Sequence, residues 1–85
     1  MPRYNVHELK VTACFYSPLA DGSKKFEIRN NDRNFKVDDI LVLRAWNPIR
    51  KEYLDVKPVI KRITYLTSFP MGLKSGHVCM SLEDF

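Results

Sequence analysis

The chain has 85 residues, with 14 Lys and Arg against 10 Asp and Glu, and a formal net charge of +4. This length fits one domain spanning residues 1–85, with a small core that buries only about 60–65% of the unfolded surface. Hydrophobic residues at 45% and charged residues at 28% indicate a folded globular chain rather than a disordered one. The basic balance is compatible with a nucleic-acid partner but does not require one.

Several classes of protein are disfavoured by the sequence. No apolar run approaches the roughly 18 residues of a membrane span, and Met1–Asn5 lacks the apolar stretch of a signal peptide. We therefore expect a cytoplasmic protein without a membrane partner. Cys14 and Cys79 have no CxxC partner, and we expect reduced thiols. His7 and His77 stand at no zinc-ligand spacing, so we predict no metal and no cofactor.

The first elements are a strand and a short helix. Weak alternation over His7–Val11 predicts a strand. The compact apolar segment Thr12–Asp21 ends at Gly22, which is typical of a helix stop. Pro18 opposes a long helix, because proline inside a helix removes a hydrogen bond. Ser17 as N-cap, with Pro18 in the first helical position, predicts a single turn. We expect one short helix or two short helical pieces.

The middle of the chain predicts two more strands. Lys24–Arg29 alternates, and residues 30–34 have the composition of a turn. Ile40–Trp46 is apolar nearly throughout and rich in branched residues, as in a strand buried on both faces or closing a barrel. Residues 47–52 are predicted to be a hairpin loop, because they contain Asn-Pro and several charges.

The last third is less clear at Tyr53–Leu66. Its apolar spacing fits a helix, but its β-branched residues and Pro58 favour a strand bent at a bulge. Residues 67–76 are predicted to be a loop and His77–Glu83 the last strand. Together these elements predict a mainly β fold, a compact β-barrel of five or six short strands with one small helix.

The most distinctive segment is Gly22–Arg33. Strand alternation sends Phe26 and Ile28 to one face and three charged residues to the other. These three residues are Lys25, Glu27 and Arg29. Alternate strand residues lie about 7 Å apart, so one carboxylate would be held between two cations. A turn carrying Asp32 and Arg33 follows. The sequence does not decide whether this row faces a cleft or open water.

Four segments together resemble a family of small bacterial and phage domains related to the ASCH domains of the PUA-like superfamily. They are His7–Lys10, Gly22–Arg29, Asn31–Asp39 and Gly72–Val78. The resemblance runs from about Val6 to Leu82, nearly the whole chain. It implies a small twisted β-barrel with a short helix beside it, and a cleft proposed in relatives to take RNA or a modified nucleoside.

The resemblance also implies which residues line that cleft. Carried over residue by residue, they are His7, Lys10, Lys24, Glu27, Arg29, Asp32 and Arg33. Some ASCH proteins are amidohydrolases acting on acetylated cytidine. In those enzymes a lysine falls at Lys24 and an arginine at Arg29, but a threonine nucleophile falls where this chain has Glu27. The less favoured hypothesis, that the protein is an enzyme, would place Lys24 and Glu27 in the catalytic site.

Each candidate residue has a binding role and an ordinary structural role. Guanidinium groups such as Arg29 and Arg33 bind phosphate or carboxylate with two hydrogen bonds, but Arg29 could instead pair with Glu27 or Asp32. Glu27 suits a base amino group or an internal arginine better than it suits acid catalysis. Three lysines could contact phosphates or could simply be solvated; they are Lys10, Lys24 and Lys25. His7 could act as a proton donor or base, or it could be an ordinary hydrogen-bonding residue.

The aromatic residues allow similar alternatives. Trp46 could stack on a base, but a chain this short is expected to use its one tryptophan in the core. Tyr53 and Tyr65 suit the rim of a site. Met71 and Gly72 lie in the longest loop, which could cover a cleft.

Three functions follow as hypotheses. The leading one is a monomeric, non-catalytic module that binds RNA, another nucleic acid or a nucleotide in a basic cleft. The second is a bacterial or phage domain that binds a host protein. The third is the amidohydrolase of acetylated cytidine.

Overall fold

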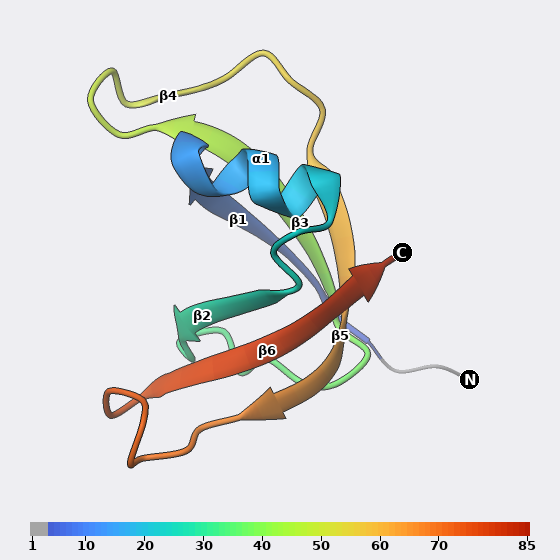
Figure 1. Cartoon of the computed structure of the whole chain (residues 1–85), viewed down its shortest axis with the longest axis vertical. Helices are drawn as coiled ribbons and strands as arrows, with labels where there is room; N and C mark the ends of the chain where they lie inside the picture. Colours follow the sequence, from blue (N-terminus) through green and yellow to red (C-terminus); the bar gives the residue numbers. More distant parts are fainter. Residues whose placement is uncertain (1–3) are drawn as a thin grey trace.

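The computed structural model describes residues 4–85 as one curled sheet with a single helix (Figure 1). The elements are β1 (Val6–Thr12), α1 (Ala13–Asp21), β2 (Phe26–Asn30), β3 (Ile40–Asn47), β4 (Glu52–Tyr53), β5 (Val59–Thr67) and β6 (His77–Asp84). The strand order is β1-β3-β5-β6-β2, with the short β4 beside β3. The prediction of a mainly β fold with one short helix is confirmed. The sheet forms a half-barrel whose two edge strands are β1 and β2.

The centre of the sheet is β3, which explains its apolar sequence. It pairs in parallel with β1 and antiparallel with β5. Its residues alternate as a strand requires: Leu41 and Leu43 are fully buried, whereas Val42 and Arg44 are half-buried on the outer face. The outer face of this strand is therefore only partly covered, although the sequence also allowed burial on both faces.

The core lies on the concave side of the sheet. It is built from alternate residues of the strands, with one residue from α1 and one from the loop after β2. Its members are Leu9, Val11, Leu19, Phe35, Leu41, Leu43, Ile63, Val78, Met80 and Leu82. Leu19 attaches α1 to the sheet, and the helix lies across β1 and β3 (Figure 1). Burial of these side chains is the main force that holds the half-barrel together.

The helix is longer than the sequence predicts. It begins at Ala13, after Thr12, and contains Pro18 in its interior, so the prediction of Ser17 as N-cap is wrong. Thr12 is the N-cap residue, but its side chain makes no capping hydrogen bond. Packing of Leu19 against the sheet compensates for the hydrogen bond that Pro18 cannot donate. Among the described residues, no helix is long and apolar enough to cross a membrane.

The predicted stop at Gly22 is confirmed, since this residue ends α1 in the left-handed conformation at φ 85°. A Cβ at Gly22 would meet no atom within 4 Å, so only the backbone conformation opposes a side chain there. Gly22→Ala is therefore expected to lower the free energy of unfolding by about 1 kcal/mol. Urea denaturation measures the change. Gly72→Ala is the matched control, expected to be nearly neutral; an equal loss in both variants would contradict the argument.

The second half of the chain also follows the prediction closely. Tyr53–Leu66 contains β4 and β5 rather than a helix, and β4 pairs with the end of β3 across the predicted hairpin. The bulge does not lie at Pro58, which precedes β5. It lies between Ile63 and Tyr65, where the pairing with β6 shifts register. Such a bulge bends a strand, and β5 links the upper and lower halves of the curled sheet (Figure 1).

Candidate functional site

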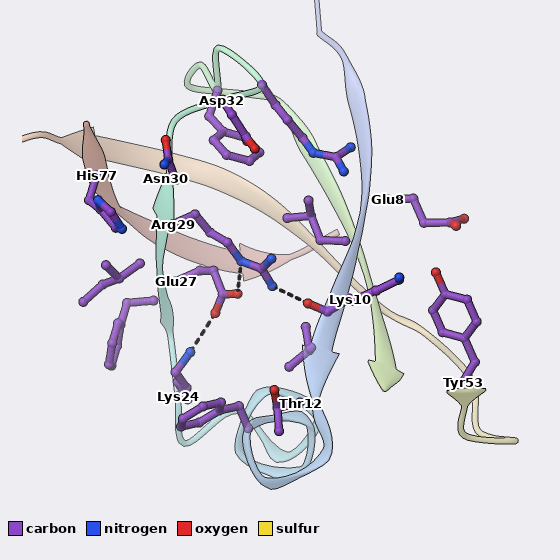
Figure 2. Close-up of a pocket in the computed structure, with 17 residues that line it drawn as sticks. Glu8, Lys10, Thr12, Lys24, Glu27, Arg29, Asn30, Asp32, Tyr53 and His77 are labelled. Atoms are coloured by element: carbon purple, nitrogen blue, oxygen red, sulfur yellow. Dashed lines mark hydrogen bonds and ion pairs between the residues drawn. The ribbon is translucent and has the colours of Figure 1, made fainter. Parts of the chain in front are cut away.

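A cavity of about 900 Å³ lies between the edge strands β1 and β2, close to the start of α1. Figure 2 shows the side chains that reach it from both strands. The lining is Glu8, Leu9, Lys10, Val11, Thr12, Phe15, Lys24, Phe26, Glu27, Ile28, Arg29, Asn30, Asp32, Arg33, Phe35, Tyr53 and His77. Six of the eight predicted site residues are in this set: Lys10, Lys24, Glu27, Arg29, Asp32 and Arg33.

A buried carboxylate stands at the centre of the cavity wall. Glu27 lies opposite Met80 on the concave face of β2, and its side chain is only 6% exposed. Lys24 Nζ donates to one carboxylate oxygen at 2.7 Å and Arg29 Nε donates to the other at 2.7 Å. The predicted carboxylate between two cations is therefore present, with Lys24 in place of Lys25. The charged face of β2 points into the cavity, and Ile28 on the opposite face is half-exposed.

Arg29 joins the two edges of the sheet. Besides its bond to Glu27, its Nη2 donates to the backbone carbonyl of Lys10 on β1 at 2.7 Å (Figure 2). Of the two internal partners predicted for Arg29, Glu27 is present and Asp32 makes no ion pair with it. A guanidinium has five donors, so Arg29 retains capacity for a ligand after these two bonds.

Two phenylalanines flank the lysine of this cluster. Lys24 Nζ lies 4.9 Å from the ring centre of Phe26 and 5.4 Å from that of Phe15. Both rings border the cavity and both are about half-exposed. Neither Phe15 nor Phe26 is among the site residues predicted from the sequence. Their only signal was apolar character, which ordinarily predicts core.

The remaining charges near the cavity are less constrained. Within residues 4–85, Asp32 and Arg33 make no ion pair or side-chain hydrogen bond. The Lys10 side chain points away from the cavity centre, toward the side where Glu8 and Tyr53 lie (Figure 2). Arg33 is thus the lining cation that is best placed to bind an anion without breaking an existing bond.

Two predicted site residues do not line the cavity. Lys25 is exposed just before β2. His7 is buried, with Nε2 2.9 Å from a carboxylate oxygen of Asp39 and its ring packed edge-on against Phe35. His7 therefore faces the core of the half-barrel, where it takes the hydrogen-bonding role that the sequence also allowed.

Asp39 organises the loop before β3. Burial would raise the pKa of its carboxyl, but bonds from the Asn5 amide, from His7 and from the Lys36 amide outweigh burial and leave that pKa below its usual value. The backbone amides lie 3.0 and 3.1 Å from the carboxylate oxygens. This network holds the start of β1 against the loop that also carries Phe35 into the core.

The aromatic and loop predictions have mixed outcomes. Trp46 is not part of the core cluster; it is half-buried on the outer face of β3, so the expectation of core is wrong. Tyr53 borders the cavity, as predicted for a rim residue, whereas Tyr65 lies 64% exposed elsewhere. Met71 and Gly72 belong to the loop before β6 and do not line the cavity.

The chemistry available in the cavity is mainly hydrogen bonding and charge pairing. In the part of the chain that the structure describes, no three His, Cys, Asp or Glu side chains are grouped to hold a metal ion. Cys14 and Cys79 are free, and neither lines the cavity. The cavity can offer carboxylate acceptors, cationic donors and aromatic faces to one ligand.

Comparison with known proteins gives two findings. The family model DUF3850, a domain of unknown function, matches residues 6–82. An uncharacterized 12.9 kDa protein in the GpA 3′ region of Escherichia phage P2 is 37% identical over 41 residues. That alignment covers 48% of this chain and 38% of the phage protein.

Proposed function

We propose that this chain, which belongs to the DUF3850 family, is a non-catalytic module that binds RNA, or a nucleotide unit of it, in the cavity between β1 and β2. The observation that carries the proposal is the buried Glu27 held by Lys24 and Arg29 in an open cavity. A ligand that matches this cluster would offer a hydrogen-bond donor to Glu27 and anionic groups to the cations beside it, as a nucleotide does.

The charges of the lining support this ligand class. The residues of the lining include four cations and three carboxylates, so the lining has a small net positive charge. Arg33 can form paired hydrogen bonds with a phosphate. Glu27 can accept from a base amino group, and the exposed rings of Phe15 and Phe26 offer stacking surfaces. These are the three kinds of contact that a nucleotide needs.

The proposal includes a relationship to the ASCH domains of the PUA-like superfamily. It is supported by the four matching segments, by the curled mainly β sheet and by the single short helix. It also includes a cytoplasmic, monomeric state, in which the thiols of Cys14 and Cys79 would remain reduced.

A titration at two salt concentrations tests the proposal. With two phosphates neutralised, affinity for a short single-stranded RNA is expected to be about five- to tenfold weaker at about 200 mM than at about 50 mM salt. Arg33→Gln is expected to reduce this dependence by roughly one phosphate contact. Fluorescence anisotropy with labelled single- and double-stranded RNA measures both. Absence of binding to either RNA, or binding indifferent to salt, would refute the proposal.

Protein binding is the second candidate, and one observation favours it. Apolar side chains are exposed on β2, on β5 and in the loop before β6. They are Phe26 and Ile28, which also border the cavity, and Tyr65, Phe69 and Met71, which do not. Exposed apolar groups of this kind occur at protein interfaces. In this case the charge reversal Arg33→Glu would leave binding to the protein partner intact, whereas Tyr65→Ser would weaken that binding.

Hydrolysis of acetylated cytidine has less support. Glu27 occupies the position of the threonine nucleophile in the similar enzymes, and both its oxygens already accept hydrogen bonds. The lining contains one aliphatic hydroxyl, that of Thr12, and one phenolic hydroxyl, that of Tyr53. Incubation with acetylated cytidine, with an active relative as positive control, tests this hypothesis. Release of acetate by this protein would show that it is a hydrolase.

A further inference from the structure

A second cluster of cations and aromatic rings lies on the outer face of β1, β3 and β4. Lys10 Nζ lies 3.9 Å from the ring centre of Trp46, and the Arg44 guanidinium carbon lies 3.8 Å from that of Tyr53. The two rings pack edge-to-face with their centres 4.9 Å apart. We call these four residues, Lys10, Arg44, Trp46 and Tyr53, the outer platform.

Strand register creates the outer platform. Lys10 lies opposite Arg44 in the β1–β3 pair, and Trp46 lies opposite Tyr53 in the β3–β4 pair. Residues two apart on β3 share a face, so Arg44 and Trp46 point the same way. The neighbours of Arg44 and Trp46 along the strand, Leu43 and Ala45, are buried in the opposite direction. The outer platform is therefore on the convex side, away from the core.

The cations of the outer platform are held by rings more than by carboxylates. Lys10 makes no ion pair within residues 4–85, and Arg44 makes one at 3.4 Å with Glu8, whose side chain is 59% exposed. An exposed pair of this length contributes little. Both cations are therefore available to an incoming anion.

A purely structural role would use these contacts to attach the two-residue strand β4 to β3. Exposed cation–ring contacts do stabilise folds. However, single-stranded nucleic acid also binds to surfaces of this kind, where its bases stack on aromatic rings and its phosphates contact neighbouring cations. Tyr53 is 37% exposed, and Trp46 is only half-buried. The chain has no other tryptophan.

The outer platform is continuous with the cavity. Lys10 and Tyr53 belong to the cavity lining as well, and β1 alone separates the two sites. A strand is roughly 5 Å wide in this direction. We propose that an RNA strand with one nucleotide in the cavity crosses the edge of β1 and places its next nucleotide on the outer platform. This inference rests on the proposed function and names its ligand as a single strand rather than a free nucleotide.

The test compares a mononucleotide with a short single strand. Trp46→Leu is expected to weaken binding of a labelled, mixed-sequence RNA octamer about tenfold and to leave the affinity for nucleoside monophosphates unchanged. Tyr65→Leu removes an exposed aromatic residue elsewhere on the sheet and is expected to change neither. Arg44→Gln, which retains the tryptophan, is expected to weaken the octamer several-fold and to lower its salt dependence by about one phosphate.

Tryptophan fluorescence of the unmodified protein supplies an independent readout, because Trp46 is the single tryptophan. The octamer is expected to quench it and a mononucleotide is not. Equal octamer affinities for wild type, Trp46→Leu and Arg44→Gln would overturn the inference while mononucleotide binding still upheld the cavity. If neither ligand bound the wild-type protein, both the inference and the proposed function would be overturned.

Discussion

Replacement of Arg29 by alanine is expected to weaken RNA binding by roughly 10- to 100-fold. Arg29 orients Glu27 through a 2.7 Å bond and connects β2 to the Lys10 carbonyl of β1. Hydrogen bonds to charged groups contribute about 1.5–3 kcal/mol each, and about 1.4 kcal/mol corresponds to tenfold in affinity. The variant would lose a ligand donor and the correct position of the carboxylate together. Anisotropy titration at low salt measures the loss.

The control for this prediction is another arginine on the same sheet. Arg62 pairs with Glu83 and Asp38 on the outer face, away from the cavity. Arg62→Ala removes the same charge, so it accounts for the change in overall electrostatic attraction. If both variants lose affinity equally, binding depends on net charge alone and the cavity is not the site.

Removal of the Asp39 carboxylate is expected to have the largest effect on stability. Asp39→Ala would leave two backbone amides and His7 without their acceptor in a buried position. Breaking such a network costs about 3–5 kcal/mol, a large part of the stability of a small domain. Urea denaturation at neutral pH measures the difference. Asp55→Ala, at an exposed position in the loop after β4, is the matched control and is expected to be nearly neutral.

The same residue predicts a pH dependence. The pKa of Asp39 is lower in the folded chain than its usual value, so the ionised carboxylate favours the folded state. This contribution is complete above about pH 4 and is lost as the pH falls through the folded pKa. The stability difference between wild type and Asp39→Ala should therefore narrow in acid. A difference that stays constant from neutral pH to pH 3 would contradict this role for ionised Asp39.

Much of the fold could be predicted because local signals agree with it. The apolar run of β3, the turn between β3 and β4, and the stop at Gly22 each follow from residue type alone. The start of α1 was misplaced because Ser17 followed by Pro18 is a typical helix start. Pro18 instead lies inside a helix that the packing of Leu19 stabilises. Local rules fail there because a tertiary contact outweighs them.

The site was predictable in composition but not in orientation. Alternation groups Glu27 with Arg29, and the structure keeps them together. The usual rule would bury Phe26 and Ile28, yet on this edge strand the charged face turns inward toward the cavity. The role of His7 could not be predicted, because its partner Asp39 lies 32 residues away and no local pattern connects the two.

The bulge in β5 has a consequence for the cavity that it does not touch. β1 and β2 are separated by one helix along the chain, but across the sheet they are connected through β3, β5 and β6. The width of the opening between them therefore depends on how sharply the sheet turns at Ile63–Tyr65, where the register shifts. Replacement of the buried Ile63 by a smaller residue would loosen the packing at this turn and change the gap between β1 and β2, although Ile63 does not line the cavity.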